Sequence, residues 1–394
     1  MDKDSSKLYI FIIWEKSRNY SEKILKDLSQ KFTIRDIYEI SWNKNNFLKN
    51  LKRFYGKSLP DAKKKAEICG TGPFLLVVIS DDEPEFLNPS PTSFVFENDL
   101  VNQKIVECKK KYRDWIGIDY TVHSSQSQNE TNHNLTLIFG KNLSDFQKTL
   151  PDEWSGTINK MNMDLIGNEG WKDMKQLLYV LNGTSNYVIL RNFEEMPEKF
   201  DYKDIDLLAD DEKLAFIVNS NFSIEKDNSR TFRTKIADQT VTFNPNYLGD
   251  HYYDIKWERE ILKKKILHEK KFYIPSNEDY FYTLYYHVLF HGRWQNKKEI
   301  SEKYKKKLNE LSIQLNIKNF KKEFLEDLEK SKGFVENYMT KMAYRHPFST
   351  TYRIRHNEIN RLSKAAILLA KNQGIKFLMI AAIDKIKFVL GLRK

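Results

Sequence analysis

The chain has 394 residues, of which 40% are hydrophobic and 13% aromatic; this suits about two or three domains with ordinary cores and excludes a disordered protein. The formal net charge of +11 favours polyanionic partners, including nucleotide phosphates, nucleic acid and anionic lipid, without choosing among them. Two cysteines, Cys69 and Cys108, exclude a disulfide framework and a cysteine metal motif. With no secretory signal and no long uncharged apolar stretch, we expect a cytoplasmic protein.

Residues 1–150 predict an α/β domain. Strands are expected at residues 8–14, 33–40 and 74–79, and helices at 20–31, 43–55 and 98–116. The alternation of strand and helix, with a continuous apolar run at 74–79, favours a parallel sheet. The Gly70–Gly72 turn precedes its strand, whereas a dinucleotide-binding turn follows one, so we exclude that site. The lysines of 98–116 are expected to form a solvated face.

The stretch after that helix carries His123, Glu130 and His133. Histidine and glutamate are zinc ligands, but this spacing fits no zinc motif. We therefore expect that a helix is capped by Ser124–Ser127 and that the histidines bond locally. A role in binding substrate stays open. Residues 151–160 predict a linker, and an amphipathic helix is expected from 161.

The central stretch from 186 to 214 is the part around which the chain is organised. Tyr187–Leu190 and Ile205–Leu208 predict two strands joined by a polar connection. Alternation along a strand places Asp204 and Asp206 on one face, where two carboxylates repel unless a cation lies between them. Mg²⁺ (or Mn²⁺), held by carboxylate and phosphate oxygens, is the expected ion. We expect Asp206→Asn to weaken metal binding and to leave the fold intact or slightly stabilised.

The run LRNFE followed by DIDLL resembles the nucleotidyltransferase superfold, the DNA polymerase beta-like family. It is most similar to a bacterial branch associated with surface-polysaccharide synthesis, over residues 177–250. The resemblance implies a mixed sheet, a metal held by Asp204 and Asp206, and transfer of a nucleotidyl or phosphoryl-alditol group. The Gly-Ser pair that usually follows the first strand is replaced here by Arg191 and Asn192, so phosphate positioning is expected to rest on Arg191.

A hairpin is predicted over 230–248, turning at Asp238–Gln239. The superfold commonly carries a third carboxylate on such a strand, and by position this slot falls on Asn244, which is neutral. Asp250 or Asp238 is the alternative oxygen donor. One metal, or a site that binds without catalysing, therefore stays open.

Residues 256–394 predict an all-α region. Ser276 is expected to cap an aromatic core helix, with Asp279 at the third position. His287 and His291 lie at i and i+4 but lack the intervening glutamate of a zinc protease, so we expect packed, hydrogen-bonded histidines. Nearby basic residues leave a phosphate-facing surface open.

The tail, residues 375–394, has an apolar helical stripe with basic residues at its ends. It is expected to pack either on the protein's own core or on an anionic membrane surface. In the second case the protein is peripheral at the inner face of the membrane.

We thus expect an α/β and α+β multidomain protein with an α/β domain at 1–150, a nucleotidyltransferase-like mixed sheet at 161–255 and helices at 256–394. Asp204, Asp206 and Arg191 are the expected catalytic residues. The expected cofactor-binding residues are Arg191, Asn192, Asn244, Asp250, His287 and His291.

Expected partners are a nucleotide or sugar nucleotide and a glycan or lipid-linked acceptor. Nucleic acid is not expected, because no ribonucleoprotein motif is present. An Asp-x-Asp glycosyltransferase and a degenerate nucleotide-binding scaffold are the alternatives.

Overall fold

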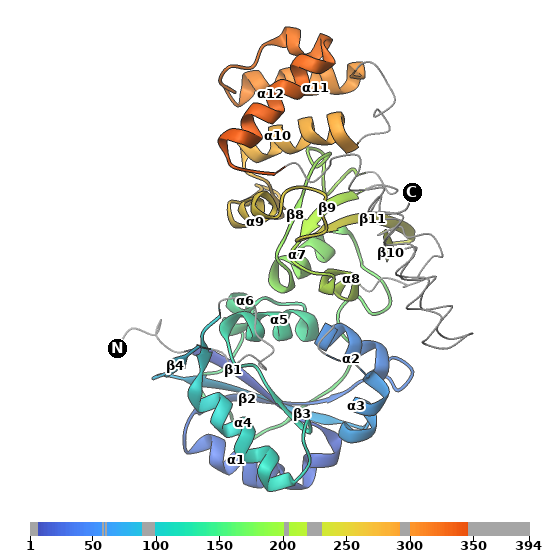
Figure 1. Cartoon of the computed structure of the whole chain (residues 1–394). Coiled ribbons are helices and arrows are strands. Elements are labelled where there is room, and N and C mark those ends of the chain that lie inside the picture. The colour runs from blue at the N-terminus through green and yellow to red at the C-terminus, as the bar shows by residue number, and fades with distance from the viewer. Residues whose placement is uncertain are drawn as a thin grey trace, which may run out of the picture.

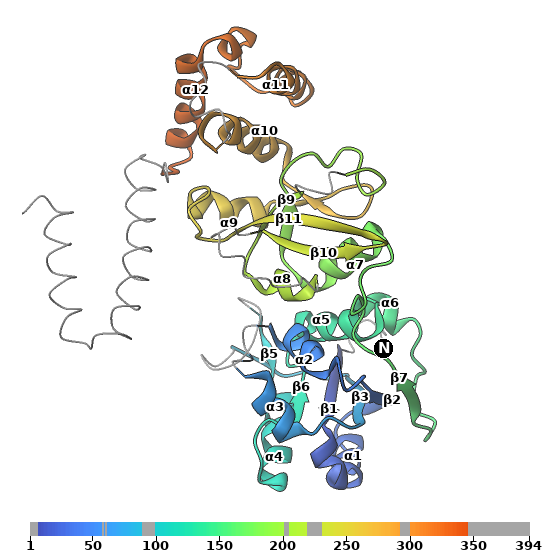
Figure 2. The ribbon, with the colours of Figure 1, turned by 90° about the vertical axis from the view of Figure 1, so that its right-hand side faces the viewer.

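Three parts of the chain are stacked along one direction in the computed structural model, as Figures 1 and 2 show. The structure describes residues 7–56, 59, 61–88, 99–200, 205–218, 231–291 and 300–345. Helices and sheets are mixed throughout, so the mixed fold class is confirmed. Within these residues, we find no helix that combines the length and the apolar character needed to cross a membrane. Asp204 and the tail 375–394 lie outside the described residues.

The N-terminal part is built on a five-stranded sheet with the order β6-β1-β3-β2-β7. Its strands are β1 (Lys7–Ile13), β2 (Thr33–Ser41), β3 (Phe74–Asp81), β6 (Val122–Ser124) and β7 (Asn159–Asn162). β3 lies between β1 and β2 and runs antiparallel to both, and only β2 and β7 pair in parallel. The predicted parallel sheet is therefore wrong, because a continuous apolar run reports burial on both faces and says nothing of strand direction.

Both faces of this sheet are indeed covered. On β1, Leu8, Ile10 and Ile12 belong to one apolar cluster, whereas Tyr9 and Phe11 belong to another. The second cluster packs against α1 (Ser21–Ser29) and α4 (Gln103–Ile116). The first packs against α2, α3 and α5 and continues into the rest of the molecule. The remaining elements of this part are η1 (Glu15–Tyr20), α2 (Phe47–Tyr55), α3 (Ala62–Cys69), β4 (Phe86–Leu87), β5 (Val101–Asn102), α5 (Gln128–Phe139) and α6 (Leu143–Gln147).

The segment between the first two parts differs from its prediction. Residues 159–162 form strand β7, and the helix expected from 161 begins only at Met174, as α7 (Met174–Thr184). Asp173 caps it by accepting a hydrogen bond from the Gln176 amide. Gly167 has a φ of +77°, and a Cβ there would lie 2.6 Å from the Trp171 ring. The close approach of that indole therefore requires glycine and excludes a helix through this point.

The central part is a four-stranded mixed sheet with the order β10-β11-β9-β8. Its strands are β8 (Tyr187–Ile189), β9 (Ile205–Ala209), β10 (Phe232–Ile236) and β11 (Gln239–Tyr247). β9 and β11 are parallel, and the other two pairs are antiparallel. The predicted hairpin is present, with its turn at Ala237–Asp238. Helices α7, α8 (Lys213–Ile217) and α9 (Ile255–Lys263) surround the sheet (Figure 1).

The C-terminal part is mainly helical. It contains β12 (Ile266–Leu267), β13 (Tyr273–Ile274), α10 (Asn277–Tyr286), the π-helical turn η3 (His287–His291), α11 (Glu302–Gln314), η5 (Lys322–Glu326) and α12 (Leu328–Lys341). The β12–β13 hairpin corrects the all-α prediction; Lys271, with a φ of +67°, makes its tight turn. The predicted cap is confirmed, since the Ser276 hydroxyl accepts from the Asp279 amide at 3.2 Å.

Candidate functional site

The candidate site lies where the central sheet meets the π-helical turn. Arg191 follows β8, Asp206 lies in β9, Tyr252 lies in the loop after β11, and His287 and His291 bound η3. A π-helical turn is rare and is frequently found at functional sites. The sequence placed four of these residues in one site, and the structure joins them by a chain of contacts through the fifth, Tyr252.

Arg191 and Asp206 form a buried ion pair, with 2.8 Å between Arg191 Nη2 and Asp206 Oδ1. Arg191 is 5% and Asp206 7% exposed. Burial by itself would lower the pKa of Arg191, but the neighbouring Tyr252 and Asp206 raise it, so the guanidinium stays charged. The ion pair changes the expected effect of Asp206→Asn from a neutral or slightly stabilising one to a destabilising one, because removal of the Asp206 charge leaves the Arg191 cation buried without its partner.

Tyr252 connects this pair to the histidines. Arg191 Nη2 donates to the Tyr252 hydroxyl at 3.3 Å, and that hydroxyl lies 2.7 Å from His287 Nδ1. Burial, aided by the Arg191 charge, lowers the pKa of His287 to about 2, so this ring is neutral. In a neutral ring, Nδ1 accepts from the Tyr252 hydroxyl in one tautomer and donates to it in the other, so this contact holds in both.

His291 holds Tyr252 from the other side. Its Nε2 lies 2.7 Å from the Tyr252 carbonyl oxygen, which can only accept, so Nε2 carries a proton. Its ring stacks on the phenol ring with 3.9 Å between centroids and an interplanar angle of 8°. The predicted packing of both histidines through hydrogen bonds is confirmed. Tyr252 was missed, and its only signal was the aromatic pair that follows Asp250.

Asn244 is placed beside Asp206 by strand register. The two residues are direct partners on the parallel strands β11 and β9. Paired residues of neighbouring strands point to the same face of a sheet, so the two side chains share a face. Asn244 therefore lies beside Asp206, while its assignment to a third-carboxylate slot and its role in binding stay predictions.

Asp250 shapes the loop that carries Tyr252. Its Oδ2 accepts from the Tyr247 amide at 2.8 Å, and its Oδ1 accepts from the Tyr252 amide at 2.8 Å. The structure thus gives Asp250 a positioning role in addition to the ligand role predicted for it. Asp238, the other alternative oxygen donor, lies in the exposed hairpin turn and pairs with Lys235 at 4.0 Å.

Glu258 is a second residue that shapes this loop, and sequence reasoning missed it. It is fully buried and accepts from the Gly249 amide at 2.7 Å and the Tyr253 amide at 3.1 Å. Burial raises its pKa to about 7, although these two hydrogen bonds oppose the rise. A signal was present, because Glu258 lies on the same helical face as the buried Trp257 and Ile261.

Asn192 occupies the turn directly after Arg191. It is exposed and has a φ of +58°, the left-handed region that asparagine tolerates better than most residues. It therefore supplies a left-handed backbone conformation at the turn after Arg191. In the described part of the chain, no hydrogen bond joins its side chain to the network of Arg191, Asp206, Tyr252 and the histidines.

The donor set fits a hard divalent cation. Asp206 and Asn244 offer carboxylate and amide oxygens on one face, which are the ligand types that Mg²⁺ prefers. Arg191 competes with such an ion for Asp206. Among the described residues, no three histidine, cysteine or carboxylate side chains cluster as a metal site would require.

For the second histidine cluster, His123 Nε2 lies 3.9 Å from Glu130 Oε1, and His133 Nδ1 lies 3.2 Å from the Thr184 carbonyl.

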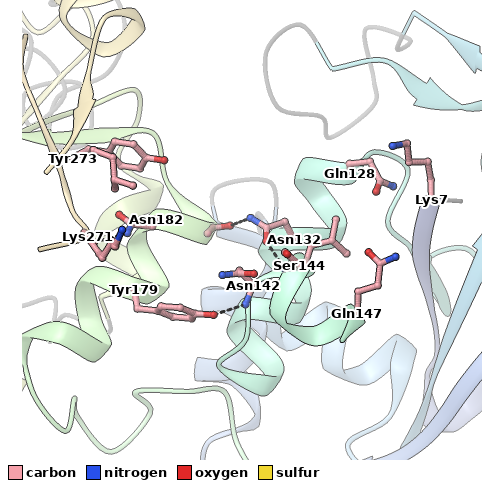
Figure 3. Close-up of a pocket in the computed structure, with 13 residues that line it drawn as sticks. Lys7, Gln128, Asn132, Asn142, Ser144, Gln147, Tyr179, Asn182, Lys271 and Tyr273 are labelled. Carbon is pink, nitrogen blue, oxygen red and sulfur yellow. Dashed lines mark hydrogen bonds between the residues drawn. The ribbon is translucent and has the colours of Figure 1, made fainter. Parts of the chain in front are cut away.

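A cavity of about 620 Å³ lies between the N-terminal part on one side and α7 with the β12–β13 hairpin on the other, and Figure 3 shows residues from both sides. Several of its polar side chains form hydrogen bonds within the protein. Asn132 donates to the Gly183 carbonyl at 3.0 Å, and the Tyr179 hydroxyl accepts from the Asn142 amide at 3.0 Å (Figure 3). These hydrogen bonds join the N-terminal part to α7.

When the chain is compared with protein-family models, with curated proteins and with solved structures, no match is found in any of the three.

Proposed function

We propose that the chain is a metal-dependent transferase that moves a nucleotidyl or phosphoryl-alditol group at the site of Arg191 and Asp206. The observation that carries this proposal is the register of Asp206 with Asn244 on adjacent parallel strands, next to Arg191, which follows β8. The mixed four-stranded sheet supports it, because the resemblance implied a sheet of this kind. The three-domain division at 1–150, 161–255 and 256–394 is part of the proposal.

Each residue has a proposed role. Arg191 offers the guanidinium fork that suits phosphate oxygens, and Tyr252 and Asp206 hold it in place. Asp206, Asn244 and Asp204 would hold Mg²⁺ or Mn²⁺, which would neutralise charge that develops on a transferring phosphoryl group. The neutral His287 and the donor His291 fix Tyr252 and so orient Arg191. Asn192 provides the backbone turn that lets Arg191 return toward Asp206.

The partners follow from the resemblance and the charge. We propose a nucleotide or sugar nucleotide as donor and a glycan or lipid-linked acceptor in bacterial surface-glycan synthesis. The net charge of +11 suits anionic substrates and an anionic membrane surface. The tail at 375–394 is the proposed contact with that surface, which would make the protein peripheral at the inner face of the membrane. Truncation of 375–394 followed by liposome flotation tests this contact; unchanged flotation would contradict it.

The proposed metal site is tested by adding a carboxylate. Asn244→Asp should tighten Mn²⁺ binding, measured by calorimetry, by about tenfold, because it adds an anionic oxygen beside Asp206. Thr242→Asp is the matched control: it lies on the same strand and face, one alternate residue further from Asp206. Only the first variant should bind Mn²⁺ more tightly. Equal behaviour of the two variants would place the metal elsewhere.

Turnover is tested on the wild-type chain. A panel of nucleoside triphosphates, sugar nucleotides and alditol nucleotides is scanned by thermal shift with Mn²⁺ and with a chelator, and the leaving group is identified for each stabilising compound. A metal-dependent shift with release of pyrophosphate or a nucleoside monophosphate supports transfer of a phosphorus-containing group. Release of a nucleoside diphosphate from a sugar nucleotide would instead support the glycosyltransferase alternative.

A catalytically degenerate nucleotide-binding protein is the second candidate. The neutral Asn244 and the Arg191–Asp206 ion pair favour it, because the pair already neutralises the carboxylate that a metal would need. In this case nucleotide binding should be independent of Mn²⁺, and no product should form.

A further inference from the structure

A second polar cavity, of about 790 Å³, lies in the N-terminal part, between α3 and α4. Its volume falls within the range of small-ligand sites. Five cationic side chains line it, two from α3 and three from α4: Lys64, Lys65, Lys109, Lys110 and Arg113. The sequence predicted a solvated face for the α4 lysines, whereas Lys109 and Arg113 are half-buried here. The cavity shares no lining residue with the Arg191 site.

These cations are not neutralised within the fold. Across the described ranges, no carboxylate lies within ion-pair distance of any of the five. Lys65 is only 7% exposed, and its Nζ donates to the Tyr120 carbonyl at 2.5 Å. Arg113 is held in position by two hydrogen bonds to the Val122 carbonyl, at 3.0 and 2.9 Å. A buried ammonium without a counter-charge is costly, and a bound anion would offset that cost.

The carboxyl groups that line the cavity do not cancel this charge. Asp61 caps α3 by accepting from two backbone amides, and Asp114 and Asp119 are exposed. Glu130 is buried and accepts from the Gln126 amide at 2.7 Å. Burial raises the pKa of Glu130 to about 7, although Lys109 opposes the rise. The Gln126 side chain is buried too, and its Oε1 has no hydrogen-bond partner in the described part of the chain.

The cavity also offers aromatic surface. The Lys65 ammonium lies 5.1 Å from the centre of the Tyr55 ring and 5.5 Å from that of Tyr120, and both tyrosines line the cavity. Arg113 lies 5.5 Å from the Tyr120 ring centre. Ring faces of this kind pack against the carbon skeleton of a small organic ligand, while the cations hold its charged end.

We propose that this cavity binds a small phosphorylated ligand, with a phosphate or diphosphate group held by the α3 and α4 cations and the organic group against Tyr55 and Tyr120. Lysine and arginine together suit such an anion, since lysine acts as a point charge and arginine donates in a planar fork. The ligand is either a nucleotide or a sugar phosphate, which share this chemistry. The proposal goes beyond the transferase assignment and does not depend on it.

The test measures binding of inorganic pyrophosphate, ribose 5-phosphate and uridine diphosphate to the full chain by calorimetry without divalent metal. Lys64→Gln/Lys110→Gln removes two exposed cavity cations, so folding should be unaffected. Lys26→Gln/Lys63→Gln is the matched control: it removes the same charge from exposed lysines of α1 and α3 that do not line the cavity. The cavity variant should bind the tightest probe at least about tenfold more weakly than wild type, and the control should bind as wild type does.

The relative affinities identify the ligand source, because uridine diphosphate tests the nucleotide and ribose 5-phosphate the sugar phosphate. Equal affinity in all three proteins would place the anion elsewhere and overturn the proposal. Equal weakening in both double variants would show attraction to net charge only and would overturn it too, as would a lack of binding at millimolar concentration. The two sites share no residue, so these variants should leave Mn²⁺ binding at the Asp206 site unchanged, and failure here is distinguishable from failure of the transferase proposal.

Discussion

The Arg191 site and the cavity between α3 and α4 handle a buried cation in opposite ways. Arg191 and Lys65 are almost equally buried, at 5% and 7% exposed. Arg191 has a carboxylate at 2.8 Å, whereas the Lys65 ammonium has a backbone carbonyl and aromatic rings. In the first site a carboxylate of the fold neutralises the buried cation. In the second site no described carboxylate pairs with the cations, and a bound anion would neutralise them. The comparison indicates that an ion pair must be opened before a ligand reaches Asp206, whereas no ion pair of the described residues blocks the cavity cations.

Arg191→Met should have the largest effect on stability. The variant leaves the Asp206 carboxylate buried without its partner, so the free energy of unfolding should fall by about 3–5 kcal/mol. Urea denaturation measures this, with Arg259→Met, an exposed arginine of α9, as control, expected to change stability by about 0.5 kcal/mol or less. The double variant Arg191→Met/Asp206→Leu should recover much of the loss. If the free energy of unfolding of Arg191→Met falls by less than about 1 kcal/mol, the Arg191–Asp206 ion pair contributes little to stability, and the prediction is wrong.

Glu130→Gln should have the next largest effect, and it should depend on pH. Since burial raises the pKa of Glu130 to about 7, the folded protein holds a proton that the unfolded chain has released above its ordinary pKa of 4.5. Wild-type stability should therefore fall as pH rises from about 4.5 to 7, and the glutamine variant should lack this loss. At pH 8 the variant should be more stable by on the order of 2 kcal/mol, and at pH 4.5 the difference should be small.

Urea midpoints across this pH range test the Glu130 prediction. Glu107→Gln is the control, because Glu107 is an exposed residue of α4 and should show no such trend. A difference between Glu130→Gln and wild type that is constant with pH would mean that Glu130 carries its charge throughout the range. The cavity would then hold a permanent internal anion, and the contrast with the Arg191 site would weaken.

Local patterns predicted the local features of this fold well. The apolar runs located β1 and β3, Ser276 was identified as a cap, and the hairpin of β10 and β11 placed Asn244 in the slot beside Asp206. The strands, the cap and the hairpin each depend on residues close in sequence, whereas the position of Asn244 beside Asp206 depends on the pairing of β11 with β9 and was expected from the resemblance.

The other features that join distant segments were not predicted. The antiparallel insertion of β3 depends on which strands pair, and an apolar run carries no information on that. Arg191 and Asp206 were both identified as site residues, but their ion pair was not predicted. The repulsion expected between Asp204 and Asp206 was assigned to a metal ion, and not to a cationic side chain. Tyr252 reaches His287 across 35 residues of sequence. The anion cavity was missed because its cations come from two helices that no sequence pattern relates.

Lys65→Met should have the smallest effect, and its sign is the sharpest test of the comparison. The methionine replaces an ammonium that has no carboxylate partner with an apolar chain of similar length, and its sulfur can pack on the Tyr55 and Tyr120 rings. Removing a buried, unneutralised charge should raise the free energy of unfolding by up to about 1 kcal/mol, whereas the same substitution at Arg191 lowers it.

The Lys65→Met variant should also bind pyrophosphate more weakly, so stability and binding should change in opposite directions, as expected where a residue is kept for a ligand. Denaturation and calorimetry on one preparation measure both quantities. If Lys65→Met destabilises the protein by more than about 1 kcal/mol, the carbonyl of Tyr120 and the rings already satisfy the ammonium, and the distinction between the two sites does not hold.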